Sequence, residues 1–406
     1  MTDSALVQAI DEWLIDQALG EPDMAGLFGQ MCERVLAIGI PIGRATVTWT
    51  TLHPLVDAEQ ATWLRTTGIT TTQIPHAQRG SQRWLDSPLR WLIVHRADIM
   101  RRRLAGPEQF LDFPFLEELS GDGFTDYVAM AVGIEHRMTR GEGEPTGIII
   151  TWTSDQPRGF TDGDIQSLQQ LKQRYAVVAR VAIQKRMTDN IATTYLGNQA
   201  GRRVLTGQIR LGDGETTDAV VWYSDLRGST RLADTLPPEK FRALLNGYFQ
   251  AMAGAAIEEG GEVLDFIGDA VLAIFPIGPD GDVEAAAKRA CRAAGRAVSA
   301  MAELNRQRAE SGEPALGYGL GLNRGEVMFG NIGVPQRLTF SVIGPTVNQV
   351  ARIEGLTKSV GEPVLATREI AEHAPDAWTP AGTHALKGIA EEIELFAFRP
   401  RDAAAA

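Results

Sequence analysis

Hydrophobic side chains recur at helical spacing near the start of the chain. Apolar residues fall four positions apart at Leu6, Ile10 and Leu14. With Ser4 as a suitable N-cap, this spacing predicts a helix over residues 4–18. The same spacing predicts a second helix over residues 24–38. The chain is therefore expected to open with two amphipathic helices.

Alternating and β-branched runs follow these helices. They predict four strands in the first half of the chain, at residues 44–52, 61–65, 126–134 and 146–153. Glycine and proline between the last two strands indicate a turn at residues 140–145. Residues 70–109 have no clear period, and no element is assigned to them.

A long helix is predicted over residues 162–195, with Thr161 as its N-cap and acidic residues in its first turn, where the helix dipole favours them. We therefore expect an α/β domain over residues 1–161, followed by a helical linker over residues 162–215. A helix–sheet domain that continues into such a helix resembles the GAF/PAS class of sensor in topology alone. A dimerisation domain or a purely structural domain is the alternative interpretation.

Strands and helices alternate in the second half of the chain, which predicts a mixed α+β or α/β domain over residues 216–400. The longer predicted elements are strands at 218–224, 316–322, 325–331 and 337–343, a hairpin at 262–276, and helices at 238–259, 283–308 and 345–357. Short elements are expected at 363–366, 368–373, 384–389 and 392–398.

Composition narrows the classes of protein that fit. The 406 residues are 44% hydrophobic, which suits two or three folded domains, and the formal net charge is -12. This acidic balance argues against a nucleic-acid partner or an anionic membrane. Two lone cysteines, Cys32 and Cys291, suit a reducing compartment and give neither a disulfide framework nor a zinc site. No signal-peptide pattern and no apolar run of ~18 residues is seen, so a cytoplasmic protein is expected.

Two carboxylates stand where apolar runs end. Asp225 follows the predicted strand 218–224, and Asp269 lies in a Gly-Asp turn between two apolar segments. Taken alone, Asp225 would more often be a helix cap than a ligand. As a pair, the two residues suit a hard divalent cation, because Mg²⁺ takes few protein oxygens and completes its shell with water and phosphate. The pair predicts a two-metal site that holds a nucleoside triphosphate.

Five short motifs occur in a fixed order in this half of the chain: Ser224–Thr230, Ile267–Ala270, Asn323–Val327, Val342–Glu354 and Leu386–Gly388. In this order they resemble the catalytic domain of the class III adenylate/guanylate cyclases, over residues 217–400. The resemblance implies a ferredoxin-like domain that works as a head-to-tail homodimer with two active sites at its interface. A diguanylate-type synthase is disfavoured, because Ile267–Ala270 stands where that class has a different turn.

The resemblance implies a role for each matching residue. Asp225 and Asp269 would bind two Mg²⁺ or Mn²⁺ ions, and a second copy of the chain would supply Asn348 and Arg352. The triphosphate would be held by Lys387 and by the backbone amides of Leu226, Arg227, Gly228 and Ser229. Without the motif, the Asn348 and Arg352 pair would read as a solvated helix face with Glu354, and Lys387 as a surface lysine in a turn.

The chemistry agrees with these roles. Cyclisation needs the ribose 3′-hydroxyl to attack the α-phosphate and expel pyrophosphate, and a metal pair both activates the hydroxyl and neutralises developing charge. Asn348 and Arg352 are four residues apart and so project from one face of the predicted helix. The amide can orient the ribose, and the planar guanidinium can contact the anionic transition state at two points.

The base is not determined by the residues at the two positions that select it in this family. At the first position adenylate cyclases usually have lysine and guanylate cyclases tend to have glutamate. At the second position adenylate cyclases usually have aspartate or threonine and guanylate cyclases tend to have cysteine. This chain has Asp265 and Ser341. Asp265 can accept from adenine N6 or from guanine N1 and N2, and Ser341 can donate or accept. ATP is preferred because bacterial soluble cyclases of this layout are mostly taken to make cyclic AMP. GTP, or nucleotide binding without turnover, remains the alternative.

The regulator of the first domain cannot be identified from the sequence. A small molecule or a protein is expected to act on residues 1–161 and to change activity through the helix at 162–195. Five aromatic residues could line a ligand pocket or could equally form core: Trp84, Trp91, Phe110, Phe113 and Phe115.

Overall fold

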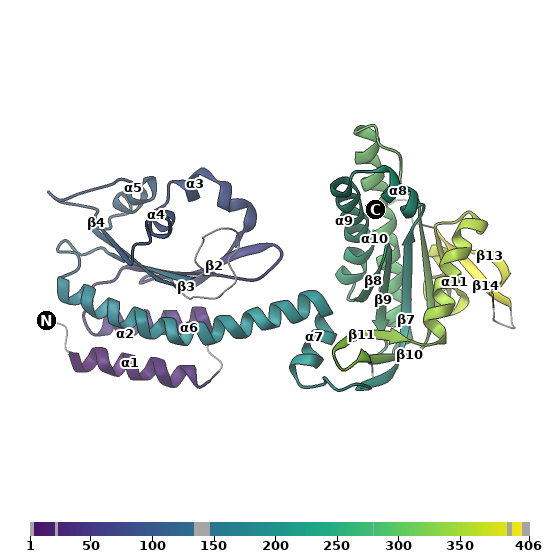
Figure 1. The fold of residues 1–406 in the computed structure, drawn as a ribbon, viewed down its shortest axis with the longest axis horizontal. Coiled ribbons are helices and arrows are strands. Elements are labelled where there is room, and N and C mark those ends of the chain that lie inside the picture. The colour runs from purple at the N-terminus through teal and green to yellow at the C-terminus, as the bar shows by residue number, and fades with distance from the viewer. Residues whose placement is uncertain (1–3, 21–22, 134–146, 279, 388–391, 400–406) are drawn as a thin grey trace. The chain divides into compact units, whose positions relative to one another are not determined.

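The computed structural model describes residues 4–20, 23–133, 147–278, 280–387 and 392–399, in two compact units, 1–191 and 192–406 (Figure 1). The turn predicted at residues 140–145 and Gly388 of the last motif lie outside the described residues. None of the helices in the described part combines the length and the apolar composition that a membrane crossing requires.

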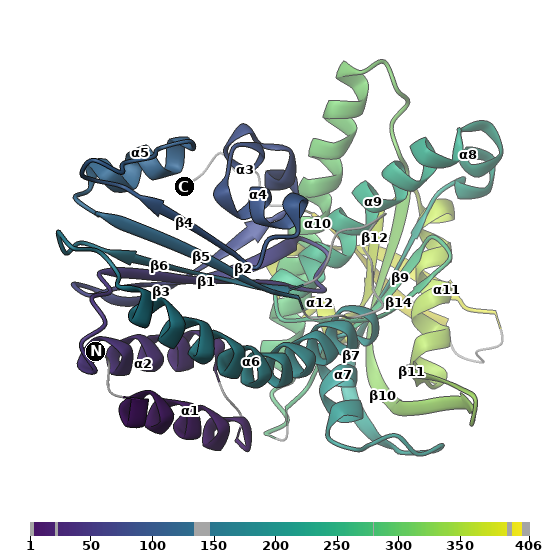
Figure 2. The same cartoon turned by 60° about the vertical axis from the view of Figure 1, so that its left-hand side comes forward.

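The first unit contains a six-stranded antiparallel sheet in the order β3-β2-β1-β6-β5-β4. Its strands are β1 (Arg44–Thr50), β2 (Val56–Leu64), β3 (Gly68–Pro75), β4 (Ile99–Arg103), β5 (Asp126–Gly133) and β6 (Gly147–Ser154). Helices cover both faces (Figure 2). One layer holds α1 (Ser4–Ala18), α2 (Met24–Ala37) and α6 (Asp162–Leu196); the other holds α3 (Gln82–Leu85), α4 (Pro88–His95) and α5 (Pro114–Gly121).

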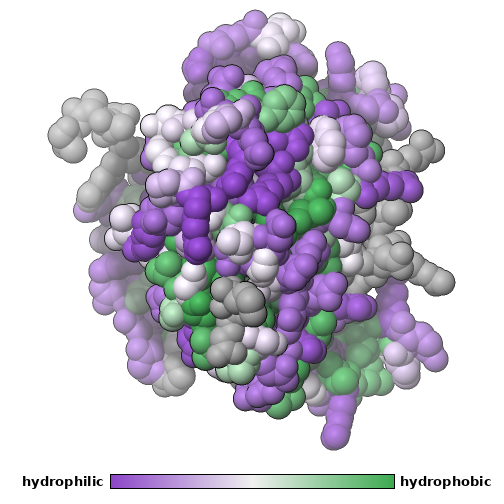
Figure 3. Space-filling view, turned by 90° about the vertical axis from the view of Figure 1, so that its left-hand side faces the viewer, coloured by the Kyte–Doolittle hydropathy of each residue, from purple (hydrophilic) through white to green (hydrophobic). Residues whose placement is uncertain are grey.

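The alternation of side chains along β6 separates two cores in this unit. Ile150 and Trp152 point into a core with α1, α2 and α6, whereas Ile149 points into a core with α4 and α5. The first core is anchored by Tyr175 of α6, whose hydroxyl donates to the carbonyl of Met24 at 3.0 Å. The first half of α6 is therefore part of the core of this unit. On the face shown in Figure 3, hydrophilic residues surround smaller hydrophobic patches, the ordinary pattern of a protein surface.

The second unit is built on an eight-stranded sheet in the order β13-β14-β12-β10-β7-β9-β8, with β11 paired to β10. Its strands are β7 (Gly214–Leu226), β8 (Glu262–Ile267), β9 (Ala270–Pro276), β10 (Tyr318–Val334), β11 (Arg337–Ile343), β12 (Val364–Thr367), β13 (Trp378–Ala385) and β14 (Glu392–Phe398). Its helices are α7 (Asn198–Leu205), α8 (Ser229–Thr235), α9 (Pro238–Glu258), α10 (Val283–Glu310), α11 (Pro345–Val360) and α12 (Arg368–Ala371).

Small residues bring the helices of the second unit close to its sheet. Buried alanines of α10 join Trp222 of β7 and Tyr248 of α9 in one core. On another face, α11 packs directly on β10, where a Cβ on Gly321 would lie 2.7 Å from the carbonyl oxygen of Val350. This close contact fixes the position of α11 relative to the end of β7.

Two predicted boundaries in this unit are wrong. Residues 316–322 and 325–331 are not separate strands, because β10 runs unbroken through Gly325, which pairs with Ala219 of β7. Glycine is required at that position because a Cβ would lie 2.6 Å from the hydroxyl of Thr346, so it does not mark a turn. The short element predicted at 384–389 coincides only with the last two residues of β13, which begins at Trp378 and has a register shift between Pro380 and Gly382; residues 388–389 lie outside the described part of the chain.

Candidate active site

Asp225 is positioned by a central strand of the second unit's sheet, β7. β7 lies between β10 and β9, and its interior residues Val220, Val221 and Trp222 are fully buried. Asp225 stands one residue before the end of this strand, opposite Gly319 of β10. Its side chain is part-buried, and among the described residues its Oδ1 atom has no hydrogen-bond partner.

Asp269 is positioned by a two-residue hairpin turn. Ile267 pairs with Ala270, so Gly268 and Asp269 form the turn between β8 and β9. Gly268 has φ +68°, a conformation that glycine adopts without a steric penalty. Because β9 pairs with β7, the turn lies beside the end of β7, and the Asp269 carboxyl is within hydrogen-bonding reach of the Asp225 carboxyl. The two predicted ligands are thus brought together.

The environment of this pair fits a divalent cation. Burial raises the pKa of Asp225 to about 6, the adjacent Asp269 contributes to the rise, and the Leu226 amide opposes it. A cation would offset both the burial and the repulsion of like charges, and carboxylate oxygens are what Mg²⁺ prefers. Within the described ranges no group of three His, Cys, Asp or Glu residues is arranged to hold a metal. Water and phosphate would have to complete the coordination.

A third acidic residue, Glu354 of α11, approaches the pair. Its side chain lies over Gly319, where a Cβ would collide with Glu354 Oε1. Burial raises the pKa of Glu354 to about 7, Asp225 and Asp269 add to the rise, and Arg227 opposes it. In the sequence Glu354 is the last residue of the fourth motif, and no role at the metal site is predicted for it. The available signal was Gly319 and Gly321, two alternate glycines in a strand, which indicate a closely packed neighbour.

Part of the loop after Asp225 is already hydrogen-bonded to other residues of its own chain. The Arg227 amide donates to the carbonyl of Gly317 at 2.9 Å, and its guanidinium donates to the Thr357 hydroxyl at 3.1 Å. The amides of Gly228 and Ser229 have no backbone acceptor in the described part of the chain. Of the four predicted phosphate donors, these two are therefore the ones open to a ligand.

Asn348 and Arg352 lie on the outer face of α11. Val350 and Ile353 on the opposite face are fully buried, whereas Asn348 is exposed and Arg352 is part-buried. Among the described residues neither forms a hydrogen bond or an ion pair with Asp225 or Asp269. The two predicted catalytic residues therefore have no polar interaction with the aspartate pair in the described part of one chain.

The remaining predicted residues also lie apart from the aspartates. Asp265 is part-buried in β8 opposite Leu272, beside a shift in strand register. Ser341 is part-buried in β11 opposite Gly330, and Lys387 is exposed just after β13. The structure shows no hydrogen bond from Lys387 or Ser341 to the aspartate pair in the part of the chain that it describes.

The second half of the chain is similar to proteins of a known family. Residues 213–374 match the family model of the adenylate and guanylate cyclase catalytic domain. An adenylate cyclase of Anabaena cylindrica is 33% identical over 162 residues, which cover 40% of this chain and 32% of that protein. The crystal structure of the adenylyl cyclase CyaB from P. aeruginosa is 25% identical and covers 47% of this chain and 97% of that one, with a TM-score of 0.41. A guanylyl cyclase structure is 30% identical and covers 47% of this chain and 96% of that one, with a TM-score of 0.41.

Residues 213–374 are therefore a class III adenylate/guanylate cyclase catalytic domain. The chain matches about a third of the length of the curated relatives. The names of these matches include adenylate cyclases and a guanylyl cyclase.

Proposed function

We propose that this protein is a nucleotidyl cyclase that converts ATP to 3′,5′-cyclic AMP and pyrophosphate at the interface of a homodimer. The observation that supports it most directly is the close pair of Asp225 and Asp269 at adjacent strand ends, with a buried carboxylate oxygen that has no partner in the described residues. This arrangement lies inside the matched cyclase domain.

Each group of residues has a distinct task in this proposal. Asp225 and Asp269 hold two Mg²⁺ or Mn²⁺ ions, which supply charge neutralisation at the phosphates and activate the attacking hydroxyl. The Gly228 and Ser229 amides donate to the triphosphate, and Lys387 adds positive charge beside it. The proposed contacts leave the Arg227 side chain bound to Thr357, where it holds the loop against α11.

Asn348 and Arg352 act on the nucleotide bound by the second copy of the chain. Both face away from the core of their own unit, and no described residue forms an ion pair with Arg352. A free guanidinium can contact the anionic transition state at two points, and the Asn348 amide can orient the ribose. Both residues would then be supplied across the dimer interface.

ATP is favoured over GTP as the substrate. Asp265 can accept a hydrogen bond from the adenine N6 amino group, and Ser341 can form a further hydrogen bond with the adenine. The relative from Anabaena cylindrica is named an adenylate cyclase. Guanylate cyclase activity is the second candidate, because the same two side chains can accept and donate to guanine. Turnover of ATP and GTP by wild type and by Asp265→Lys distinguishes them: lysine at this position should raise the preference for ATP.

The decisive assay measures pyrophosphate and cyclic product from purified protein with Mn²⁺ and ATP or GTP. We expect product from wild type and none from Asp225→Ala. Absence of cyclic product from both nucleotides would overturn the proposal. Nucleotide binding without turnover would instead support a non-catalytic signalling module on a cyclase fold.

Regulation by the first unit is part of the proposal. The two half-sites of a dimer must close together, so a change in the paired helices over residues 162–195 would change turnover. A shortened chain beginning near Arg210 should differ from the full chain in rate or in dimerisation. Equal values of both would argue against a regulatory role for residues 1–161, whether GAF-like or not.

A further inference from the structure

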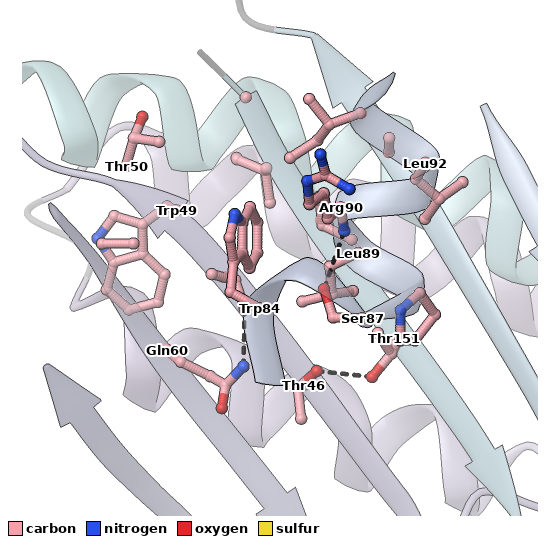
Figure 4. Close-up of a pocket in the computed structure, with 18 of the residues that line it drawn as sticks. Thr46, Trp49, Thr50, Gln60, Trp84, Ser87, Leu89, Arg90, Leu92 and Thr151 are labelled. Carbon is pink, nitrogen blue, oxygen red and sulfur yellow. Dashed lines mark hydrogen bonds between the residues drawn. The ribbon is translucent and has the colours of Figure 1, made fainter. Parts of the chain in front are cut away.

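A cavity of about 830 Å³ lies in the first unit, between the sheet and the α3–α4 segment (Figure 4). This volume is in the range of small-molecule sites in proteins. One wall is apolar and contains Leu89, Leu92 and Ile149, and the floor is the face of the sheet that carries Thr46 and Thr151. Of the aromatic cluster noted in the sequence, Trp84 and Phe115 line the cavity.

Three polar residues at one end of the sheet form a cross-strand row. Arg44 of β1 pairs with Thr153 of β6, which pairs with Tyr127 of β5. Each has a buried polar atom without a hydrogen-bond partner in the described chain: Arg44 Nη1, Thr153 Oγ1 and Tyr127 Oη. Arg44 and Tyr127 line the cavity, and Tyr127 is 0% exposed. Unsatisfied buried polar groups are rare in folded proteins, so three in one row indicate a missing acceptor.

The charge of Arg44 is the strongest part of this signal. Burial lowers the pKa of Arg44, against the opposing effects of Tyr127 and Asp122. No described carboxylate forms an ion pair with it, whereas on β4 Arg102 binds Asp112 through two hydrogen bonds of 2.9 and 2.8 Å. Arg101 also has a carboxylate partner, Asp126, at 2.7 Å. Arg44 is therefore a part-buried cation of the cavity lining that has no carboxylate partner among the described residues.

The next row of the sheet is different. The hydroxyls of Thr46 and Thr151 face each other at 2.6 Å and satisfy one another (Figure 4). Trp49 Nε1, also in the lining, is a further buried donor without a partner in the described chain. The wall beside the Arg44 row is apolar, with Leu89, Leu92 and Phe115. A ligand that matches this pattern has one anionic end and an apolar body.

We propose that this cavity binds a small organic carboxylate with an apolar or aromatic body. Its oxygens accept hydrogen bonds from the Arg44 guanidinium and the Tyr127 hydroxyl, and its body packs against Leu89, Leu92 and Phe115. The part-buried cation then gains the counter-charge that the described chain does not provide. This site belongs to the first unit and does not depend on the proposed cyclase activity.

The test compares matched acids and amides on the full-length protein. Phenylacetate and 1-naphthylacetate are titrated by calorimetry beside phenylacetamide and 1-naphthylacetamide, which have the same shape and no charge. We expect at least one acid to bind about tenfold or more tightly than its amide, and Arg44→Met to remove that difference. Arg102→Met is the control, because that arginine already has a carboxylate partner and lies outside the cavity lining; acid binding should be unchanged.

A second variant separates binding from folding. Tyr127→Phe keeps the ring in the core and removes one donor, so it should weaken acid binding severalfold while amide binding stays constant. Equal binding of acid and amide, an acid affinity that is unchanged in both Arg44→Met and Tyr127→Phe, or no binding of either acid would overturn the proposal.

Discussion

The carboxyl of Asp225 lies part-buried beside that of Asp269, and burial together with this neighbour raises its pKa to about 6 in the metal-free chain. Asp225→Asn removes one of the two like charges and keeps the side-chain volume. We expect cyclase turnover to fall at least about 100-fold, because one ligand of the metal pair is lost. The midpoint of thermal unfolding without metal should stay the same or rise.

Asp234→Asn is the matched control for that substitution. Asp234 is an exposed residue of α8 near the same site, so its loss should change neither turnover nor unfolding. If Asp225→Asn retained wild-type turnover, Asp225 would not be a metal ligand.

The pH dependence of stability follows from the raised pKa values of Asp225, about 6, and Glu354, about 7. The metal-free folded protein holds these protons more tightly than the unfolded chain. The resulting stabilisation is complete below about pH 4 and is lost as pH rises through 6 and then 7.

Chelator-treated wild type and Glu354→Gln should therefore differ in the pH dependence of thermal unfolding. Relative to wild type, Glu354→Gln should gain stability between about pH 5 and pH 8, because the amide has no proton to lose. Mn²⁺ should raise the unfolding midpoint of wild type more at about pH 8 than at about pH 5. A parallel pH profile for the two proteins would contradict the raised pKa of Glu354.

At the scale of elements, the contact between α11 and β10 determines where Glu354 lies. A Cβ on Gly319 would collide with Glu354 and come within 2.5 Å of the Thr357 hydroxyl. Gly319→Ala should therefore lower the free energy of unfolding by about 1–3 kcal/mol in urea denaturation, the usual cost of overpacking.

Gly355→Ala is a matched control in the helix that Gly319 contacts. A Cβ there meets nothing within 4 Å, and the backbone is helical. Alanine should add about 0.5–1 kcal/mol, because glycine loses more backbone entropy in a helix. Equal effects of the two substitutions would show that α11 does not press on β10 at Gly319.

Elements with a strong period are predictable from the sequence alone. The helix expected at 162–195 is α6, and the hairpin expected at 262–276 is β8 and β9. Residues 70–109 are not predictable, because α3 has four residues and α4 has eight, too few for a clear period. The prediction divides β10 into two strands, whereas the strand continues through Gly325, where a Cβ would lie against Thr346.

The candidate site is likewise only partly predictable from the sequence. Asp225 and Asp269 are predictable because each follows an apolar run at a strand end, and pairing of β7 with β9 brings strand ends together. The position of Glu354 near the aspartate pair is not predictable from the sequence, because it depends on how closely α11 packs on β10. Nor could a pattern of residues show that the Arg227 amide already binds Gly317.

At the scale of the whole molecule, the proposed active site requires two chains. Asp225 and Asp269 lie at strand ends, while Asn348 and Arg352 lie on the outer face of α11 and form no hydrogen bond or ion pair with either aspartate in the described chain. If each site takes its aspartates from one copy and its arginine from the other, two inactive variants should complement each other. The variants are Asp225→Ala and Arg352→Ala, unfolded together and refolded as a mixture.

In a mixed dimer of these variants, one site carries both substitutions and the other carries neither. Random pairing makes half of the dimers mixed, each with one intact site of two, so turnover should recover to about a quarter of wild type. Mixing Asp225→Ala with Asp269→Ala is the matched control, because every site then lacks one aspartate, and no turnover should return. No recovery in the test mixture while gel filtration shows dimers would place all four residues in a site within one chain. Recovery in the control would instead place Asp225 and Asp269 of one site in different chains, and either result would contradict the proposed arrangement.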